Sequence, residues 1–267
     1  MNPLASNASA PVRSPDFRLD GRTALVTGAS SGLGRHFARL LAAHGASVAV
    51  AARRADKLAD LVDEIKAEGG QALAVTLDVT DPASVEEALT AVADRIGVPD
   101  VVINNAGLTV TRPLLEQTVP DFDKVMDTNL RGCWLVATAA ARRMVAAGRR
   151  GSIVNIASIL GERVAGGVAP YAISKAGVIQ ATKAMALELA RMPCSANALL
   201  PGYVVTDLNR EFLESDAGRK LQARIPTRRF GELADLDGPL LLLASDAGRA
   251  MSGAAVAVDG AHLVSSL

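Results

Sequence analysis

TALVTGASSGLG, residues 23–34, joins a short apolar run to a glycine-rich turn and to the start of a helical pattern. The run at 23–27 has the length of a buried strand. Gly28, Gly32 and Gly34 allow the backbone to turn sharply and to approach a ligand closely. A helix that begins directly behind such a turn offers free N–H groups and a positive dipole end to a pyrophosphate. A plain turn has a similar composition, but the position between a strand and a helix favours a nucleotide-binding unit, although the spacing is G-x-x-x-G-x-G and not G-x-G-x-x-G.

The same alternation of strand and helix continues along the chain. Short apolar runs predict strands at 23–27, 47–51, 72–77, 100–104, 152–157, 195–200 and 255–258, and helical patterns lie near 32–43, 55–68, 82–95, 120–147, 170–191 and 232–245. Several runs are apolar on both faces, as in a parallel sheet that helices cover above and below. We therefore predict an α/β fold, a Rossmann-like doubly wound parallel sheet of about seven strands with helices on both faces. Residues 19–267 are expected to form one dinucleotide-binding and catalytic domain behind a disordered tail at 1–18.

Boundary signals support these elements. Asp81-Pro82 predicts a helix N-cap with a first-turn proline, and His44-Gly45 and Gly69-Gly70 predict helix ends. The long stretch at 203–231 has no regular pattern and is expected to be an irregular lid.

Composition excludes several classes of protein. The 28 basic and 28 acidic residues balance, and only 3% of residues are aromatic, so we expect neither a nucleic-acid nor a membrane partner. Cys133 and Cys194 have no metal-ligand spacing, which predicts no metal site and buried thiols in a reducing compartment. The first residues lack the pattern of a signal peptide, and we expect a cytoplasmic protein.

The end of the second predicted strand indicates which dinucleotide binds. NAD-binding folds usually place Asp or Glu there to hold the ribose 2′-hydroxyl, whereas this chain has Ala52 followed by Arg53 and Arg54. A guanidinium suits a phosphate. The alternative is a solvated basic loop. We predict NADP(H) in preference to NAD(H), with NAD(H) still possible, and with Arg53 as the main 2′-phosphate ligand and Arg54 as the secondary one.

YAISK, residues 171–175, places a tyrosine and a lysine one helical turn apart, on the same face of a predicted helix. An ordinary amphipathic helix would give the same spacing. The alternative is a phenol and an ammonium that move a proton together.

The chain resembles the single-domain branch of the short-chain dehydrogenase/reductase family from about residue 19 to the C-terminus. The resemblance rests on motifs that occur in order: TGASSGLG at 27–34, Asp78-Val79, NNAG at 104–107, Asn129 in DTNL, Ser158, Tyr171 and Lys175 in YAISK, Pro201-Gly202, and VDG at 258–260. The chain departs from the family at Ala261, where a second glycine is frequent, and at Ser31, where some NADP(H) members have a basic residue. It is similar to 3-oxoacyl reductases and related carbonyl reductases.

The resemblance implies an NAD(P)-dependent enzyme that transfers a hydride between its cofactor and a ketone or secondary alcohol. Tyr171 is implied to be the general acid/base, and Ser158 to hold the substrate oxygen. A free phenol has a pKa of about 10, so Lys175 is expected to lower it and also to hold the nicotinamide ribose. Asn129 is implied to hold a water that links Lys175 to solvent.

The resemblance also implies a larger cofactor-binding set. Asp78 and Val79 are expected beside the adenine, Asn105 and Gly107 beside the adenosine ribose, and Val204 and Thr206 beside the carboxamide. Asn104 is expected either to pin neighbouring strands together or to contact the cofactor, and Thr27 to brace the glycine turn. The full set is Gly28, Ser30, Ser31, Gly32, Leu33, Gly34, Arg53, Arg54, Asp78, Val79, Asn105, Ala106, Gly107, Tyr171, Lys175, Pro201, Gly202, Val204 and Thr206.

Several alternatives stay open at the level of sequence. The substrate is a 3-oxoacyl thioester, a small ketone, a sugar-derived ketone or a cyclic alcohol. Glu162 and Arg163 either contact a polar substrate group or are solvated loop charges. Apolar residues of the lid either close a pocket or dock the lid onto the body: Leu208, Phe212, Leu213, Leu221 and Ile225.

Assembly and activity also have alternatives. The family commonly forms tetramers, so a homotetramer is expected. The rival functions are an NAD-dependent alcohol dehydrogenase working in the oxidative direction, and a non-catalytic dinucleotide sensor on the same fold.

Overall fold

The computed structural model describes residues 15–206 and 209–265. Within these residues the chain forms a seven-stranded parallel sheet with the strand order β3-β2-β1-β4-β5-β6-β7. The order reverses between β1 and β4, which is the switch point of a doubly wound sheet. The predicted fold class is confirmed. The strands are β1 (Thr23–Thr27), β2 (Ser47–Ala52), β3 (Gln71–Thr76), β4 (Val101–Asn104), β5 (Gly151–Ile156), β6 (Cys194–Pro201) and β7 (Ala255–Val258).

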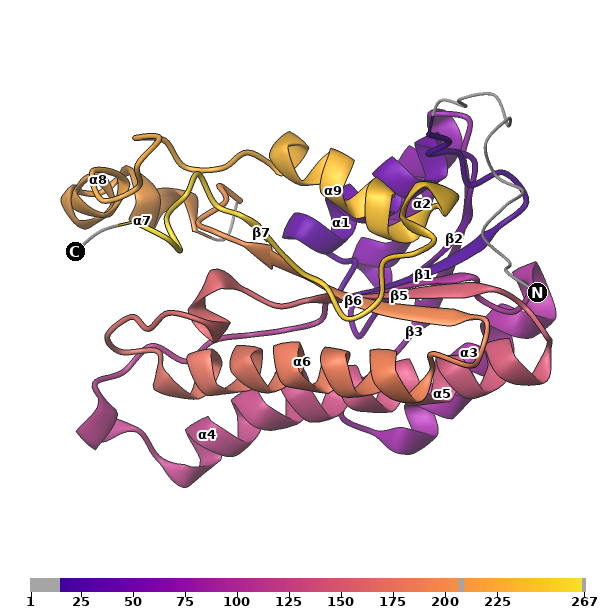
Figure 1. Cartoon of the computed structure of the whole chain (residues 1–267), viewed down its shortest axis with the longest axis horizontal. Coiled ribbons are helices and arrows are strands. Elements are labelled where there is room, and N and C mark those ends of the chain that lie inside the picture. The colour runs from indigo at the N-terminus through magenta and orange to yellow at the C-terminus, as the bar shows by residue number, and fades with distance from the viewer. Residues whose placement is uncertain (1–14, 207–208, 266–267) are drawn as a thin grey trace, which may run out of the picture.

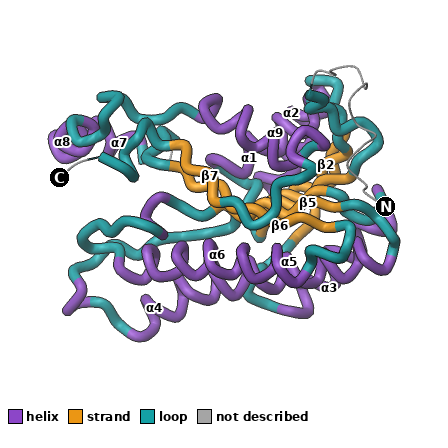
Figure 2. The backbone as a smooth tube through the Cα atoms, in the orientation of Figure 1, coloured by secondary structure: helices purple, strands orange, loops and turns teal. Residues whose placement is uncertain are grey.

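Helices cover both faces of the sheet. Figure 1 shows α1, α2 and α9 above the strands and α3, α4, α5 and α6 below them, and the tube in Figure 2 shows α7 and α8 beyond one end of β7. The helices are α1 (Gly32–Ala43), α2 (Ala55–Ala67), α3 (Pro82–Ile96), α4 (Val119–Met126), α5 (Gly132–Ala146), α6 (Ala169–Glu188), α7 (Arg210–Glu214), α8 (Asp216–Gln222) and α9 (Asp237–Ala244).

Burial of the strands follows their place in the sheet. Every residue of β1, β4 and β5 is buried, because helices lie on both faces of these central strands. The edge strands β3 and β7 alternate between more and less exposed residues. One apolar core lies between the sheet and α1, α2 and α9, and a second lies between the sheet and α3, α5 and α6. Apolar runs therefore predicted the strands reliably.

The boundary signals predicted at Asp81-Pro82, His44-Gly45 and Gly69-Gly70 are confirmed by the geometry of the helix ends. The Asp81 side chain accepts a hydrogen bond from the N–H of Ala83 (3.0 Å), with Pro82 in the first turn of α3. Such a cap stabilises a helix by about 1 kcal/mol. Gly45 and Gly69 have φ values of +98° and +84° directly after α1 and α2, a conformation that favours glycine.

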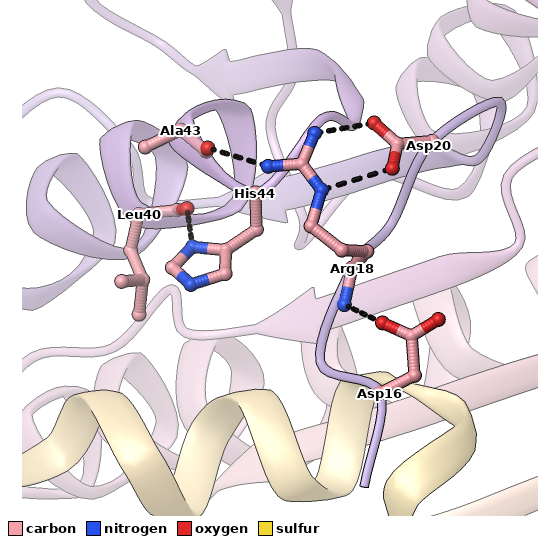
Figure 3. Close-up of polar contacts among 6 residues, drawn as sticks. All are labelled: Asp16, Arg18, Asp20, Leu40, Ala43 and His44. Atoms are coloured by element: carbon pink, nitrogen blue, oxygen red, sulfur yellow. Dashed lines mark hydrogen bonds and ion pairs between the residues drawn. The ribbon is translucent and has the colours of Figure 1, made fainter. Parts of the chain in front are cut away.

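The segment before β1 is attached to the end of α1. Figure 3 shows the guanidinium of Arg18 between the Asp20 carboxylate and the carbonyl of Ala43, with Asp16 accepting a hydrogen bond from the Arg18 N–H (2.9 Å). Beside it, the His44 ring bonds the carbonyl of Leu40 (2.9 Å). These contacts fix the entry of the chain into β1.

Four predicted elements differ from the structure. The helices expected at 170–191 and 232–245 are the shorter α6 and α9, and a 3-10 turn (Leu233–Leu236) precedes α9. The helix expected at 120–147 is α4 and α5 joined by a π-helical turn (Asp127–Arg131). The lid expected to be irregular contains the short helices α7 and α8. The π-helical turn and the helices α7 and α8 are too short to give a periodic pattern in the sequence. Helix α8 is stabilised locally, since the Ser215 hydroxyl accepts a hydrogen bond from the N–H of Gly218 (3.2 Å).

Candidate active site

The glycine turn lies between β1 and α1. Gly28 and Gly32 have φ values of +66° and +55°, where other residues are strained. A Cβ on Gly34 would lie 2.4 Å from the carbonyl oxygen of Gly28, so no side chain fits there. Ser31 begins α1 without a side-chain cap, which leaves first-turn N–H groups of the helix able to bind an anion. The turn is shaped as a phosphate cradle.

The loop after β4 holds this turn in place. The Thr27 hydroxyl accepts hydrogen bonds from the N–H groups of Asn105 (3.0 Å) and Ala106 (3.1 Å). The Asn105 amide donates to the carbonyls of Thr27 (3.0 Å) and Gly28 (3.3 Å). Thr27 therefore braces the junction as predicted. Asn105 was expected beside the adenosine ribose, but its amide N–H groups bind carbonyls of the glycine turn.

The two arginines after β2 lie at the rim of the turn. Arg54 donates to the hydroxyls of Ser30 (2.8 Å) and Ser31 (3.1 Å). Arg53 is exposed and contributes to a lowered pKa of Asp78, whose main cause is a hydrogen bond from the N–H of Thr80. Arg54, which was predicted to be the secondary phosphate ligand, is therefore the arginine that contacts the glycine turn directly.

The residues predicted beside the adenine follow β3. Asp78 accepts hydrogen bonds from the N–H (2.9 Å) and the hydroxyl (2.8 Å) of Thr80. Val79 is buried, and a Cβ on Gly132 would lie 2.7 Å from its side chain. Asp78 is half-buried, while the Val79 side chain packs against the first residue of α5. Leu33 also packs into the core.

Ser158, Tyr171 and Lys175 converge beside the carboxyl end of β5. The Lys175 ammonium lies 5.6 Å from the centroid of the Tyr171 ring and donates to the carbonyl of Ile156 (2.7 Å). Ser158 caps the turn after β5 by accepting from the N–H of Leu160 (3.1 Å), and its side chain also hydrogen-bonds Tyr171. The structure therefore brings the predicted phenol, ammonium and hydroxyl together.

Burial controls the charges in this cluster. It raises the pKa of Tyr171, and the hydrogen bond from Ser158 works in the opposite direction. Burial also lowers the pKa of Lys175 to about 8, against a smaller effect of the Cys133 thiol. The expectation that Lys175 brings the Tyr171 pKa below its usual value is wrong. The ammonium faces the ring rather than contacting the hydroxyl, and desolvation of the buried phenol is the largest influence on its pKa.

Asn129 lies in the π-helical turn, a feature frequent at functional sites. Its amide nitrogen donates to the carbonyl of Leu108 (2.9 Å) and to the Ser174 hydroxyl (3.0 Å), and its oxygen accepts from the N–H of Leu108 (2.8 Å). A Cβ on Gly107 would lie 3.3 Å from this oxygen and 3.6 Å from the Lys175 nitrogen. Asn129 is therefore close to Lys175, with both amide N–H groups used by the protein.

Two buried polar residues that the sequence analysis missed support the cluster. Ser174 donates to the carbonyl of Tyr171 (2.7 Å) and so links it to Asn129. Asn155 accepts from the amide of Asn104 (2.9 Å) across β4 and β5 and donates to Thr182 on α6 (2.8 Å). Asn104 thus joins neighbouring strands, as predicted. The signal for Asn155 was a polar residue inside an apolar strand.

The segment after β6 closes over the glycine turn. A Cβ on Gly202 would lie 2.7 Å from the Cβ of Asp259, so the backbone after Pro201 passes close to the end of β7. Val204 is buried. A Cβ on Gly32 would lie 3.9 Å from a methyl group of Thr206, which places Thr206 across from the phosphate cradle.

The lid residues differ in their burial. Leu213 and Ile225 are only 3% and 2% exposed, whereas Phe212 is 52% exposed. Leu221 is half-buried, and Leu208 lies outside the described residues. Leu213 and Ile225 therefore dock the lid onto the body, rather than closing a pocket.

Within residues 15–206 and 209–265, no group of His, Cys, Asp and Glu side chains is placed to hold a metal ion. In the same part of the chain, no helix has the length and apolar character needed to cross a membrane.

The chain matches a family model and curated relatives over most of its length. The model is described as enoyl-(acyl carrier protein) reductase and matches residues 28–261. A gluconate 5-dehydrogenase of Gluconobacter oxydans is 38% identical over 253 residues, 94% of this chain and 98% of the relative. The 3-oxoacyl-[acyl-carrier-protein] reductase FabG of Staphylococcus epidermidis is 38% identical over 240 residues, 90% of this chain and 98% of the relative.

Solved structures agree in fold. A gluconate 5-dehydrogenase from Burkholderia cenocepacia J2315, in complex with NADP and tartrate, superposes with a TM-score of 0.90 at 38% identity, covering 94% of this chain and 99% of that one. A putative gluconate dehydrogenase from Agrobacterium tumefaciens gives a TM-score of 0.91 at 36% identity, covering 95% of this chain and 100% of that one.

Proposed function

The chain belongs to the short-chain dehydrogenase/reductase family, and on that premise we propose that it reduces a ketone to a secondary alcohol with NADPH. It is an NAD(P)-dependent oxidoreductase acting on CH–OH groups. The observation that carries the finer proposal is the convergence of Ser158, Tyr171 and Lys175 beside a glycine turn shaped for a phosphate. A dinucleotide sensor would have no use for this set of groups.

In the proposed reaction Tyr171 is the proton donor. When bound, the reduced nicotinamide supplies a hydride to the carbonyl carbon. The Tyr171 hydroxyl gives its proton to the carbonyl oxygen, while the Ser158 hydroxyl donates a hydrogen bond to the same oxygen. With its pKa raised by burial, the Tyr171 phenol is protonated near neutral pH, as a proton donor to the carbonyl oxygen must be. The charge of Lys175 stabilises the phenolate that forms as the proton leaves.

The residues around the glycine turn fit a phosphorylated dinucleotide. The cradle excludes a side chain at Gly34, and first-turn N–H groups of α1 face the same loop. No carboxylate follows β2, and two guanidiniums stand at its end with the Ser30 and Ser31 hydroxyls. We assign the 2′-phosphate to Arg53 and Arg54 together.

A substrate panel tests this function. Purified protein is mixed with NADPH and with small ketones, sugar-derived ketones, 3-oxoacyl thioesters and an enoyl thioester, and NADPH absorbance is followed. We expect turnover of at least one ketone class and a much slower reaction with NADH. Turnover of the enoyl thioester alone would contradict carbonyl reduction, and secondary alcohols oxidised only with NAD would favour the alternative dehydrogenase.

We also propose that the chain assembles as a homotetramer in the cytoplasm. The outer face of α4, α5 and α6 exposes large apolar side chains: Phe122 (39%), Trp134 (46%), Ile173 (50%) and Leu187 (79%). A second copy of this face is the occupant that fits, since a symmetric interface buries the same patch on both subunits. Pairing of the edge strand β7 with another copy would supply the second interface that a tetramer needs. Sedimentation should show a tetramer, and Trp134→Arg should shift it to smaller species. A wild-type monomer at micromolar concentration would refute the assembly. The free buried thiols of Cys133 and Cys194 suit a reducing compartment.

A further inference from the structure

Arg163 lies on the loop that leads away from Ser158, and it is attached to the C-terminal segment 259–265. One of its terminal nitrogens, Nη1, donates to the carbonyl of His262 and to the Ser265 hydroxyl (2.8 Å). The segment itself is fixed, because Asp259 accepts from the N–H groups of Ala261 (3.0 Å) and Leu263 (2.6 Å). Arg163 is half-buried, whereas its neighbour Glu162 is exposed. Arg163 is therefore no solvated loop charge.

The positive charge of Arg163 has no carboxylate partner among the described residues. Elsewhere in the chain, arginines in fixed positions bind carboxylates through both ends of the guanidinium, as Arg149 does with Asp100 and Arg229 with Asp235. Arg163 uses Nη1 on two neutral oxygens, and no acceptor in the described chain takes the protons of Nε and Nη2. This free edge is the one that a carboxylate binds with two parallel hydrogen bonds.

Two neutral side chains connect this arginine to the reaction centre. The rings of Tyr203 and His262 are 5.8 Å apart. Tyr203 lies close enough to Tyr171 and to Arg163 to interact electrostatically with both. Burial raises the pKa of Tyr203 and lowers that of His262, so both stay uncharged near neutral pH. His262 is 8% exposed, and its Nδ1 has no hydrogen-bond partner in the described chain.

We propose that Arg163, with Tyr203 and His262 beside it, binds a carboxylate at the end of the substrate remote from the reacting ketone. This inference rests on the proposed carbonyl reduction and narrows its substrate class to oxo acids and the corresponding hydroxy acids. Arg163 supplies the charge and the paired donors. Tyr203, which is near both Arg163 and Tyr171, supplies a neutral hydroxyl, and the unpaired Nδ1 of His262 supplies a further polar contact beside the Tyr203 ring.

Matched oxo acids and oxo amides test the proposal. The values of kcat/KM are measured for 4-oxopentanoate, 5-oxohexanoate and longer oxo acids against their carboxamides, with NADPH. At the best chain length the wild type should prefer the acid by about 10- to 100-fold, the range of a hydrogen bond to a charged group. Arg163→Met should remove this preference mainly by raising KM for the acid, and it should leave kcat/KM for the amide within about twofold of the wild-type value. Arg163→Lys should keep part of it, because the charge stays while the paired geometry is lost.

Arg150→Met is the matched control, since Arg150 stands before the opposite end of β5 and bonds the carbonyl of Arg249 (3.0 Å). It should leave the acid preference intact. A wild type that shows no preference at any chain length would overturn the subsite, and so would an equal loss on acid and amide in Arg163→Met. If the wild type reduces no ketone, the proposed function fails instead. Calorimetric binding of hexanoate against hexanamide to the NADPH complex then decides the subsite, and equal affinity would overturn it.

Discussion

The Lys175 ammonium lies over the ring of Tyr171, 5.6 Å from its centroid, and is anchored to β5 by its hydrogen bond to the Ile156 carbonyl (2.7 Å). The lysine therefore does not contact the phenol oxygen directly. It fixes α6 against the strand that ends beside Ser158, and it places a titratable charge near Tyr171, the proposed proton donor. Its effect on the reaction should thus depend on its own protonation.

The pH profile of ketone reduction should reveal that dependence. The pKa of Lys175 is lowered to about 8, so the residue is charged below that pH and loses its proton as pH rises through it. With its raised pKa, the proposed proton donor Tyr171 stays protonated over the same range. We expect kcat/KM to be level near neutral pH and to fall above about pH 8.

Lys175→Arg is the control for this profile, because a guanidinium stays charged throughout. Its lower activity should persist to higher pH before it falls. Identical profiles for the two proteins would show that Lys175 does not cause the decline.

Replacement of Gly34 should disrupt the cofactor cradle. In Gly34→Ala the new methyl group would lie 2.4 Å from the Gly28 carbonyl, so the turn must shift. We expect loss of stability by about 1–3 kcal/mol, as for other overpacked sites, together with at least tenfold weaker NADPH binding. Gly238→Ala in α9 is the matched control, since a Cβ there meets nothing within 4 Å. Gly238→Ala should stabilise the protein slightly in urea unfolding and leave NADPH binding unchanged in a cofactor titration. Equal behaviour of the two variants would contradict the cradle.

The two arginines after β2 should determine the choice of cofactor. Arg53→Ala and Arg54→Ala should each lower kcat/KM for NADPH by about 10- to 100-fold and affect NADH little, because only NADPH carries the 2′-phosphate. Arg54→Ala should have the additional effect of freeing the Ser30 and Ser31 hydroxyls. Arg39→Ala, which removes an exposed pair with Glu68 in the second half of α1, serves as control. An unchanged NADPH/NADH ratio in both cofactor-site variants would reject the assignment.

Much of the fold was predictable because its elements depend on local patterns. The run at 23–27 and the glycines behind it determined β1 and the start of α1, and the boundaries of β7 were also predicted correctly. Boundaries were less reliable where several signals compete. The π-helical turn at 127–131 lies inside a stretch whose sequence pattern is helical throughout. Asn129 in this turn forms hydrogen bonds with Leu108 and Ser174, and no local pattern predicts these contacts.

The site was predictable where residues share one element or end neighbouring strands. Tyr171 and Lys175 share α6, and Ser158 follows β5, so spacing and topology brought them together. Electrostatics were not predictable in the same way. The direction of the Tyr171 pKa depends on how deeply the whole cluster is buried. The contact of Arg163 with His262 joins positions far apart in the sequence, and no local pattern indicates it.

The most direct test of the central claim is a comparison of wild type and Tyr171→Phe in hydride transfer from NADPH to the best ketone of the panel. The variant should bind NADPH as tightly as wild type and melt at a similar temperature. Its kcat should fall by about 10²- to 10⁴-fold, because only the proton donor is removed. Tyr203→Phe changes the chain's other tyrosine, which the proposed carboxylate subsite uses, so it should act mainly on KM for oxo acids and retain most of its kcat. Turnover by Tyr171→Phe at the wild-type rate would contradict the assignment of Tyr171 as the proton donor.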